Sequence, residues 1–295
     1  MFIKNLLFLL FFLIAFSFQG FSSEKNYNHS DSTKTWDWED FKFEFEKFHK
    51  KGKPAVSLTY GLSKINLKDF NSTFAKPNLL ELKLGNIAEY PVESDEIVKY
   101  RFTNVFLSYI STGLSNKTSA DGLSSNLWRF GGAWSSGYGY YFGTSSIVLY
   151  NSGSLNWSRL DLKDSPSNIQ DTERLENFNQ SFRFGTSVEG GIRFKIIPLI
   201  ALNAGYERSI IFERHLFWKW IGGEVIFIGG QGLLDTFIDE IKDSSPVAVP
   251  VVSFILKGAL SYGIYQLRQE KMNWPFNTVA PLAYDQFKFG ITFMF

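Results

Sequence analysis

The residues best suited to acid–base chemistry in this chain are its three histidines, His29, His49 and His215. In many hydrolases a histidine takes the proton of a serine hydroxyl while a third polar group holds the ring in place. Glu213 lies two positions before His215 and could be such a group. No serine lies beside His215 at the spacing typical of these enzymes, and a single histidine among aromatic residues is more often a packing side chain. We therefore predict that the protein is not an enzyme, with hydrolysis through His215 as the alternative.

Other kinds of chemical site have little support in the residue types. The acidic residues Asp235, Asp239, Glu240 and Asp243 lack the spacing of a calcium-binding loop, and the glycine-rich pieces precede no phosphate-binding lysine. The chain has no cysteine, and its formal net charge of +1 comes from interspersed acids and bases. Thiol chemistry and a basic surface for nucleic acid are therefore not expected. We expect neither a metal nor another cofactor.

The last eleven residues of the chain form the clearest structural element. Their apolar side chains recur at every second position and are Phe287, Phe289, Ile291, Phe293 and Phe295. The positions between them hold Gln286, Lys288, Gly290 and Thr292, and only Met294 breaks the alternation. This period predicts a strand with one apolar and one polar face. A tilted strand of about 9–11 residues crosses a bilayer, and a strand that closes a membrane barrel turns its apolar face to lipid.

This closing strand resembles the last strand of bacterial outer-membrane β-barrel proteins, which alternates in the same way and ends on phenylalanine. In that porin-like class the pattern is read by the barrel-assembly machinery. The resemblance therefore implies a location in the cell outer membrane, with outer-membrane lipid and the assembly machinery as partners. The residues that would form the assembly signal are Phe287, Phe289, Ile291, Phe293 and Phe295.

Short alternating runs, separated by turn residues, continue from Pro54 to the C-terminus. We expect strands at 56–63, 80–85, 100–110, 128–134, 182–194 and 202–210, and a hairpin of 138–150 and 155–162 around residues 151–154. Two more strands are expected within 215–228 and at 253–264. With the closing strand the count is about eleven, and because bacterial single-chain barrels have even numbers we expect ten or twelve.

One segment follows a helical period instead. Leu234, Phe237, Ile238 and Ile241 recur at i, i+3, i+4 and i+7, and Pro246 ends the pattern. We expect one short amphipathic helix here, on the periplasmic side. Its simplest role is to cap the barrel mouth or to lie in the membrane interface, and the alternative is a gate or plug.

The first part of the chain differs from the rest. Residues 1–23 have one early base, Lys4, an apolar run from Leu6 to Phe16 and small residues after it, which is typical of a signal peptide. An uncleaved anchor helix is the alternative. Residues 24–53 are predicted to be a periplasmic N-terminal segment that packs on the barrel or binds a partner, and residues 54–295 form the barrel.

On the predicted strands, the charged side chains lie at the alternate positions that hold polar residues. These positions should face the barrel interior. The charged residues are Glu81, Lys83, Arg129, Arg183, Glu189, Arg193, Glu207, Lys257 and Lys288. Six bases against three acids leave an excess of three positive charges. Charges inside a barrel must be paired or hydrated. They form either an ion-pair network that closes a small barrel or the lining of a narrow, anion-favouring pore.

The sequence thus predicts an all-β, single-domain, antiparallel transmembrane β-barrel of about ten to twelve strands with one short periplasmic-side helix. Its predicted function is structural, or that of a narrow porin-like passage for small solutes. Two alternatives belong to other classes of protein. One is an outer-membrane lipid hydrolase that uses His215, and the other is a secreted β-sandwich that serves as a binding module.

Overall fold

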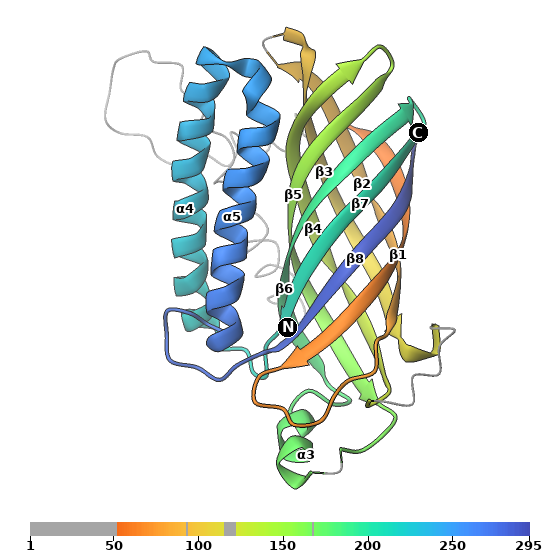
Figure 1. The fold of residues 1–295 in the computed structure, drawn as a ribbon, viewed down its shortest axis with the longest axis vertical. Coiled ribbons are helices and arrows are strands. Elements are labelled where there is room, and N and C mark those ends of the chain that lie inside the picture. The colour runs from red at the N-terminus through yellow and green to blue at the C-terminus, as the bar shows by residue number, and fades with distance from the viewer. Residues whose placement is uncertain (1–51, 93, 115–121, 167) are drawn as a thin grey trace, which may run out of the picture.

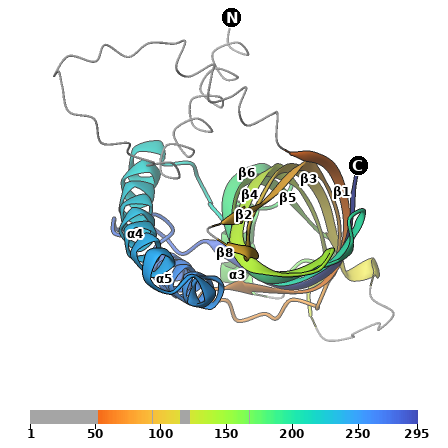
Figure 2. The same ribbon diagram turned by 90° about the horizontal axis from the view of Figure 1, so that it is seen from above.

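The computed structural model describes residues 52–92, 94–114, 122–166 and 168–295. In this part of the chain eight strands form a closed antiparallel barrel (Figures 1 and 2), and they are β1 (Lys53–Leu67), β2 (Asn78–Val92), β3 (Ser94–Ser111), β4 (Ser125–Phe142), β5 (Ser145–Leu162), β6 (Phe182–Ile197), β7 (Ile200–Ile211) and β8 (Leu282–Met294). Each strand pairs with the next one, and β1 pairs with β8 to close the ring. The predicted barrel is confirmed. The predicted signal peptide and nearly all of the N-terminal segment 24–53 lie outside the described residues.

The period-two alternation sets the direction of the side chains on the barrel wall. On β8, Phe287, Phe289 and Phe293 point outward and are exposed, whereas Gln286 and Lys288 point inward and are buried. On β1 and β2 the outward side chains are also large and apolar, and among them are Leu58, Leu62, Leu80, Leu82 and Leu84. The wall is therefore apolar outside and largely polar inside, which is the reverse of a soluble barrel.

The two ends of the barrel differ in their connections. Short turns join β2 to β3, β4 to β5 and β6 to β7 at one end, called here the turn end, where Phe295 also lies. Gly143 has φ of +64° in the turn between β4 and β5, a backbone conformation that glycine adopts without strain. The other end, called the loop end, carries the long connections. In membrane barrels of this kind the short turns are periplasmic and the long loops extracellular.

A short helix, α3 (Ile169–Glu176), lies in the loop between β5 and β6. The side chain of Asn168 caps it by accepting a hydrogen bond from the Gln170 N–H at 3.0 Å. Asp171 in its first turn accepts hydrogen bonds from the backbone N–H groups of Asn71 and Ser72, at 3.2 and 2.8 Å. These contacts fasten α3 to the loop between β1 and β2, at the mouth of the barrel.

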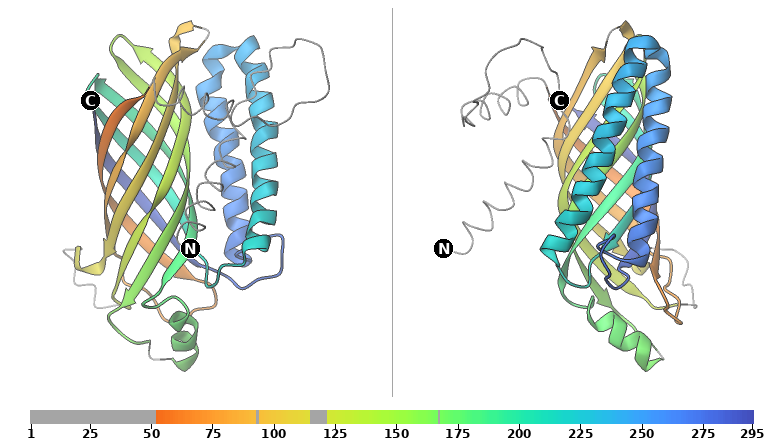
Figure 3. Two further views of the ribbon diagram at one scale, coloured as in Figure 1. Left: turned by 180° about the vertical axis from the view of Figure 1, so that it is seen from behind. Right: turned by 90° about the vertical axis from the view of Figure 1, so that its left-hand side faces the viewer.

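A long helical hairpin connects β7 to β8. It consists of α4 (Phe217–Ser244), a 3₁₀ turn at Pro246–Ala248 and α5 (Val249–Glu270). Both helices lie outside the ring of strands and run along the barrel wall from the loop end to the turn end and back (Figures 1, 2 and 3). The helix α5 packs against β4, β5, β6 and β7, and α4 packs mainly against α5.

The hairpin corrects the predicted strand number and helix length. The strands expected within 215–228 and at 253–264 are helical, and the predicted helix at 234–241 is the last part of the longer α4. Leu256, Leu260 and Ile264 also recur every fourth residue, so the same run satisfies a helical period. Residues 151–154 lie within β5 and form no turn, because the chain turns earlier, between Phe142 and Ser145. Eight strands therefore replace the expected ten or twelve.

Two apolar clusters fill the ends of the barrel interior. The loop-end cluster consists of Ile65, Leu79, Ile110, Leu123, Leu127, Leu160, Leu175, Phe178, Ile211, Leu282 and Tyr284. The turn-end cluster consists of Ala55, Ile87, Val98, Tyr100, Phe102, Val148, Tyr150, Ala201 and Met294. Leu175 of α3 and the nearby Phe178 belong to the loop-end cluster, so the loop helix is part of the packed interior and does not stand free above it.

Candidate functional site

The middle of the barrel interior holds a layer of charged side chains, called here the ionic layer, that come from five different strands. Arg129 Nη2 lies 2.7 Å from Glu81 Oε2, and the other side of the guanidinium contacts Glu207. Lys288 Nζ lies 2.8 Å from Glu81 Oε1 and 3.2 Å from Glu189 Oε2, and it also contacts Glu207. Two cations are thus shared among three carboxylates, all with little or no exposure to solvent.

Uncharged side chains complete the hydrogen bonds of this layer. The hydroxyl of Ser108 donates to Glu81 at 2.7 Å, that of Ser209 to Glu207 at 2.6 Å, and that of Tyr150 to Glu189 at 2.6 Å. The guanidinium of Arg129 lies over the ring of Phe106, 4.8 Å from its centroid. Buried charges need partners of this kind. The removal of an ion from water otherwise costs on the order of several kcal/mol in a folded protein.

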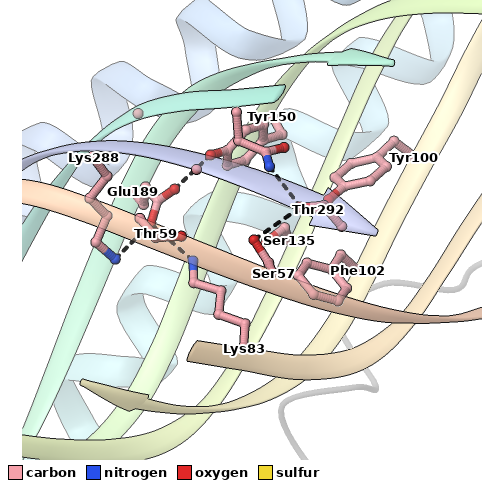
Figure 4. A pocket seen from close by; sticks show the side chains of 13 residues that line it. Ser57, Thr59, Lys83, Tyr100, Phe102, Ser135, Tyr150, Glu189, Lys288 and Thr292 are labelled. Carbon is pink, nitrogen blue, oxygen red and sulfur yellow. Dashed lines mark hydrogen bonds and ion pairs between the residues drawn. The ribbon is translucent and has the colours of Figure 1, made fainter. Parts of the chain in front are cut away.

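Lys83 forms the edge of the ionic layer on the side facing the turn end (Figure 4). Its Nζ lies 3.4 Å from Glu81 Oε1 and 3.6 Å from Glu189 Oε2. Two small cavities remain among these residues, with volumes of about 20 and 10 Å³. Each has room for about one water molecule. The cavities found beside the ionic layer are therefore of the size of single water molecules.

A second, smaller ion cluster lies nearer the turn end. Arg193 Nε is 3.3 Å from Glu89 Oε1, and Lys195 Nζ is 2.5 Å from Glu89 Oε2. The guanidinium of Arg193 also lies 5.1 Å from the centre of the Tyr100 ring. Sequence reasoning missed Glu89 and Lys195. Their spacing could have indicated that they face inward. Glu89 follows Glu81 by an even number of positions and Lys195 follows Arg193 by two, and such residues lie on the same face of a strand.

The structure brings most of the charged residues singled out in the sequence into the interior, with one clear exception. Arg183 lies on the inward parity of β6 near the loop end. Lys257 lies outside the barrel on α5, where its Nζ is 2.5 Å from Asp235 Oδ1 of α4. The prediction that Lys257 faces the lumen is wrong because strand parity does not apply to a helix. The buried interior charges on the described strands are three bases, Arg129, Arg193 and Lys288, and three acids, Glu81, Glu189 and Glu207.

His215 lies at the loop end between β7 and α4, away from the ionic layer. The rings of Phe184, Phe217 and Trp220 lie beside it, with centroid distances of 4.8, 5.9 and 6.0 Å, and the residue remains exposed to solvent. Partial burial lowers the pKa of His215 below its usual value. Contacts of this kind favour a packing role for the histidine over a role as a catalytic base.

An apolar outer wall, a closed ring without free strand edges, and a charged interior together define a transmembrane β-barrel of the outer-membrane type. In the bilayer every backbone polar group must be bonded, and a closed ring of eight strands meets that condition. The protein is thus a barrel of the outer-membrane type.

The chain was compared with protein families, curated proteins and solved structures. No protein-family model matches the sequence, and no curated protein sequence matches it significantly. Among solved structures, the chain is similar to Neisserial surface protein A, with 13% identity, a TM-score of 0.38 and coverage of 82% of this chain and 97% of that one. It is also similar to Ail, the attachment invasion locus protein of Yersinia pestis, with 9% identity, a TM-score of 0.34 and coverage of 83% and 99%.

A third similar structure is the outer membrane protein OprG from Pseudomonas aeruginosa. The identity is 11%, the TM-score is 0.24, and the match covers 82% of this chain and 97% of that one. Scores of this size transfer no activity, ligand or partner to the present chain. The proposals below therefore rest on its own residues.

Proposed function

We propose that this protein is a closed, non-enzymatic barrel of the outer membrane with a structural role, and that its interior conducts no solute. The observation that carries the proposal is the order of three packed layers along the barrel axis. The loop-end cluster and the turn-end cluster seal the two mouths, and the ionic layer lies between them. A solute would have to displace side chains in all three layers.

The charge arrangement supports closure over anion passage. A pore that favours anions needs positive side chains that face water. Here Arg129 and Lys288 are 0% and 3% exposed, and each contacts at least two carboxylates. Their positive charge is neutralised locally, so little is left to attract an anion from solution. Of the two interpretations of the charged interior, the ion-pair network has the better support.

We also propose that outer-membrane lipid and the barrel-assembly machinery are partners of the chain. The outward side chains of β1, β2 and β8 supply the lipid contact. The last residue, Phe295, follows β8 and has 71% of its surface exposed at the turn end. Its backbone N–H donates to the carbonyl of Pro54 at 2.9 Å, while its ring is free for another protein to contact.

Conductance in a planar bilayer tests closure directly. Purified, refolded protein is added to one chamber under a salt gradient, and we expect no stepwise current, because the interior is packed. Insertion must be shown in the same sample by heat-modifiable migration in gel electrophoresis. Regular current steps from inserted protein would contradict the proposal, and an anion-selective reversal potential would then favour the narrow passage.

A further inference from the structure

The helical hairpin presents an apolar face that the barrel does not cover. On α4 the side chains of Trp218, Val225, Leu233 and Phe237 point away from the barrel, and between 51% and 80% of their surface is exposed. Glycines at 229 and 232 lie on the same open side. A face of this composition is unfavourable in water and favourable against lipid chains.

The length of each helix matches the thickness of a membrane. At about 1.5 Å per residue, α4 would be about 42 Å long and α5 about 33 Å long, against a hydrocarbon core of about 30 Å. By length and composition, both helices qualify as membrane-spanning segments. They also run beside the barrel over its full height, as Figures 1 and 3 show. The hairpin therefore occupies the level at which the barrel wall contacts lipid.

Charged groups of the hairpin are placed as a membrane helix requires. Within the span, Asp235 pairs with Lys257 at 2.5 Å, and Glu224 pairs with Arg268 at 2.9 Å, so each acid of α4 faces a base of α5. The remaining charges of α4 gather near its ends, with Lys219 at the loop end and Asp239, Glu240, Lys242 and Asp243 at the turn end. Charges inside a membrane pair with one another, and those near helix ends reach the interface.

The barrel wall beneath α5 is unsuited to lipid. Its outward positions include Ser136, Asn151 and Gly190, where other parts of the wall carry large apolar side chains. Asn151 Nδ2 donates to the backbone carbonyl of Phe254 at 3.4 Å, and the ring of Phe254 covers Gly190. These small and polar residues make room for α5 and give it a polar contact.

Two outward-facing charged residues are covered in the same way. Arg208 and Asp285 are directly paired residues of β7 and β8 on the outer wall. The rings of Tyr262 and Tyr265 lie 4.1 and 5.5 Å from the Arg208 guanidinium, and the Tyr265 hydroxyl donates to Asp285 at 2.8 Å. An arginine on the lipid face of a barrel is unfavourable, most of all near the midplane. The cover provided by α5 removes that exposure.

We propose that α4 and α5 form an intramembrane helical hairpin that crosses the same bilayer as the barrel. The turn at Pro246–Ala248 lies on the periplasmic side, α5 is bound to the barrel wall, and the outer face of α4 contacts lipid acyl chains. The occupant of this face is the bilayer, because the face continues the apolar outer surface of the barrel at the same height. The inference rests on the proposed membrane barrel and adds helices to its lipid-facing surface.

Single spin labels can test this proposal cleanly, because the chain contains no cysteine. Ile226→Cys places a label on the outer face of α4, Leu107→Cys places one on the outer barrel wall, and Glu173→Cys places one on α3 at the loop end. Each variant is labelled, reconstituted in phospholipid vesicles, and measured for collision with oxygen, which concentrates in lipid, and with a water-soluble nickel chelate.

We expect the label at residue 226 to behave like the label at 107, with frequent oxygen collisions and at least fivefold fewer nickel collisions than the label at 173. If residue 107 is lipid-exposed and 226 is open to the nickel chelate, the hairpin lies outside the membrane and the inference is overturned. If residue 107 itself is open to the chelate, the membrane barrel fails. Dipolar broadening at 226 with low oxygen access would show a second copy on this face, and would also overturn the inference.

Discussion

Arg129 is the residue that connects the two sides of the ionic layer. It is fully buried, yet its guanidinium meets carboxylates from β2 and β7 and the hydroxyl of Tyr284 at 3.1 Å. Without Arg129, the two buried carboxylates would share Lys288 with Glu189, and Lys83 would be the only other cation near them among the described residues. The carboxylates therefore compensate for the burial of the positive charge of Arg129, and its guanidinium compensates for the burial of their negative charges.

Replacing Arg129 with methionine should destabilise the barrel by about 3–5 kcal/mol, because it leaves Glu81 and Glu207 with too few cations. The free energy of unfolding is measured by urea titration in lipid vesicles. The matched control is Arg159→Met, since Arg159 forms a half-exposed pair with Asp161 at 3.1 Å near the loop end of β5. Its loss should change stability by less than about 1 kcal/mol.

Adding Glu207→Gln to Arg129→Met should recover part of the lost stability, because it removes one of the two buried carboxylates that the first change leaves with too few cations. Equal stabilities for the two single arginine variants would contradict the ionic layer as a buried network.

His215 should make the loop end sensitive to pH. Its pKa in the folded protein is below the ordinary value of about 6.5 because its ring is partly buried among aromatic rings. Above pH 6.5 the ring is neutral in both states and its packing is fully stabilising. As the pH falls below 6.5 the unfolded chain binds a proton that the folded chain resists, so stability decreases down to the folded-state pKa.

The measurement is the thermal midpoint of unfolding between pH 7.5 and 5.5, compared with the variant His215→Phe. Phenylalanine keeps a ring at this position but cannot be protonated, so the variant should lose part of the decrease. His29 and His49 are present in both proteins and cancel in the difference. Identical pH profiles would show that the position does not titrate as described.

The helices and the strands of this protein are stabilised by different contacts. Each strand has its backbone bonds satisfied by two neighbours in the closed ring. The hairpin has its own helical bonds, the packing of α5 on β4 to β7, and side-chain contacts of α4 such as those of Trp220 and Ile238. Its attachment depends on a few polar contacts, among them those of Tyr265, whose hydroxyl also accepts a hydrogen bond from Gln269 at 3.0 Å.

Tyr265→Phe should loosen α5 from the wall, because a hydrogen bond to a charged group contributes about 1.5–3 kcal/mol. Amide hydrogen exchange in the last turns of α5 should become about 10- to 100-fold faster. Tyr262→Phe is the matched control, since the ring that covers Arg208 is retained. Equal exchange in both variants would show that the Asp285 bond does not hold the helix.

At the scale of the whole molecule, the barrel is closed by residues that are far apart in the chain. Strand β1 pairs with β8 across more than two hundred residues, and the last residue reaches back to Pro54. Strand β8 completes the ring by pairing with both β1 and β7. The proposed role of Phe295 in assembly can be separated from a role in stability, because its side chain is exposed.

Phe295→Glu should lower the amount of folded, heat-modifiable protein in the outer membrane several-fold. The refolded variant should keep its unfolding free energy within about 0.5 kcal/mol, because the side chain is exposed in the folded barrel. Leu199→Glu is the matched control, since Leu199 is 57% exposed at the same end of the barrel. If both variants assemble equally well, Phe295 is not part of an assembly signal.

The sequence by itself determined the barrel class and the direction of most side chains. Period-two alternation is a local property, so it placed Phe287 and Phe289 outside and Glu81, Arg129 and Lys288 inside without knowledge of their neighbours. Only the tertiary structure decided the strand number, the helical hairpin and the pairing of the interior charges. Residues 253–264 fit both a strand and a helical period, and packing on the barrel wall selected the helix. The interior charges pair between strands remote in sequence, as Arg129 does with Glu207, and no local pattern contains that pairing.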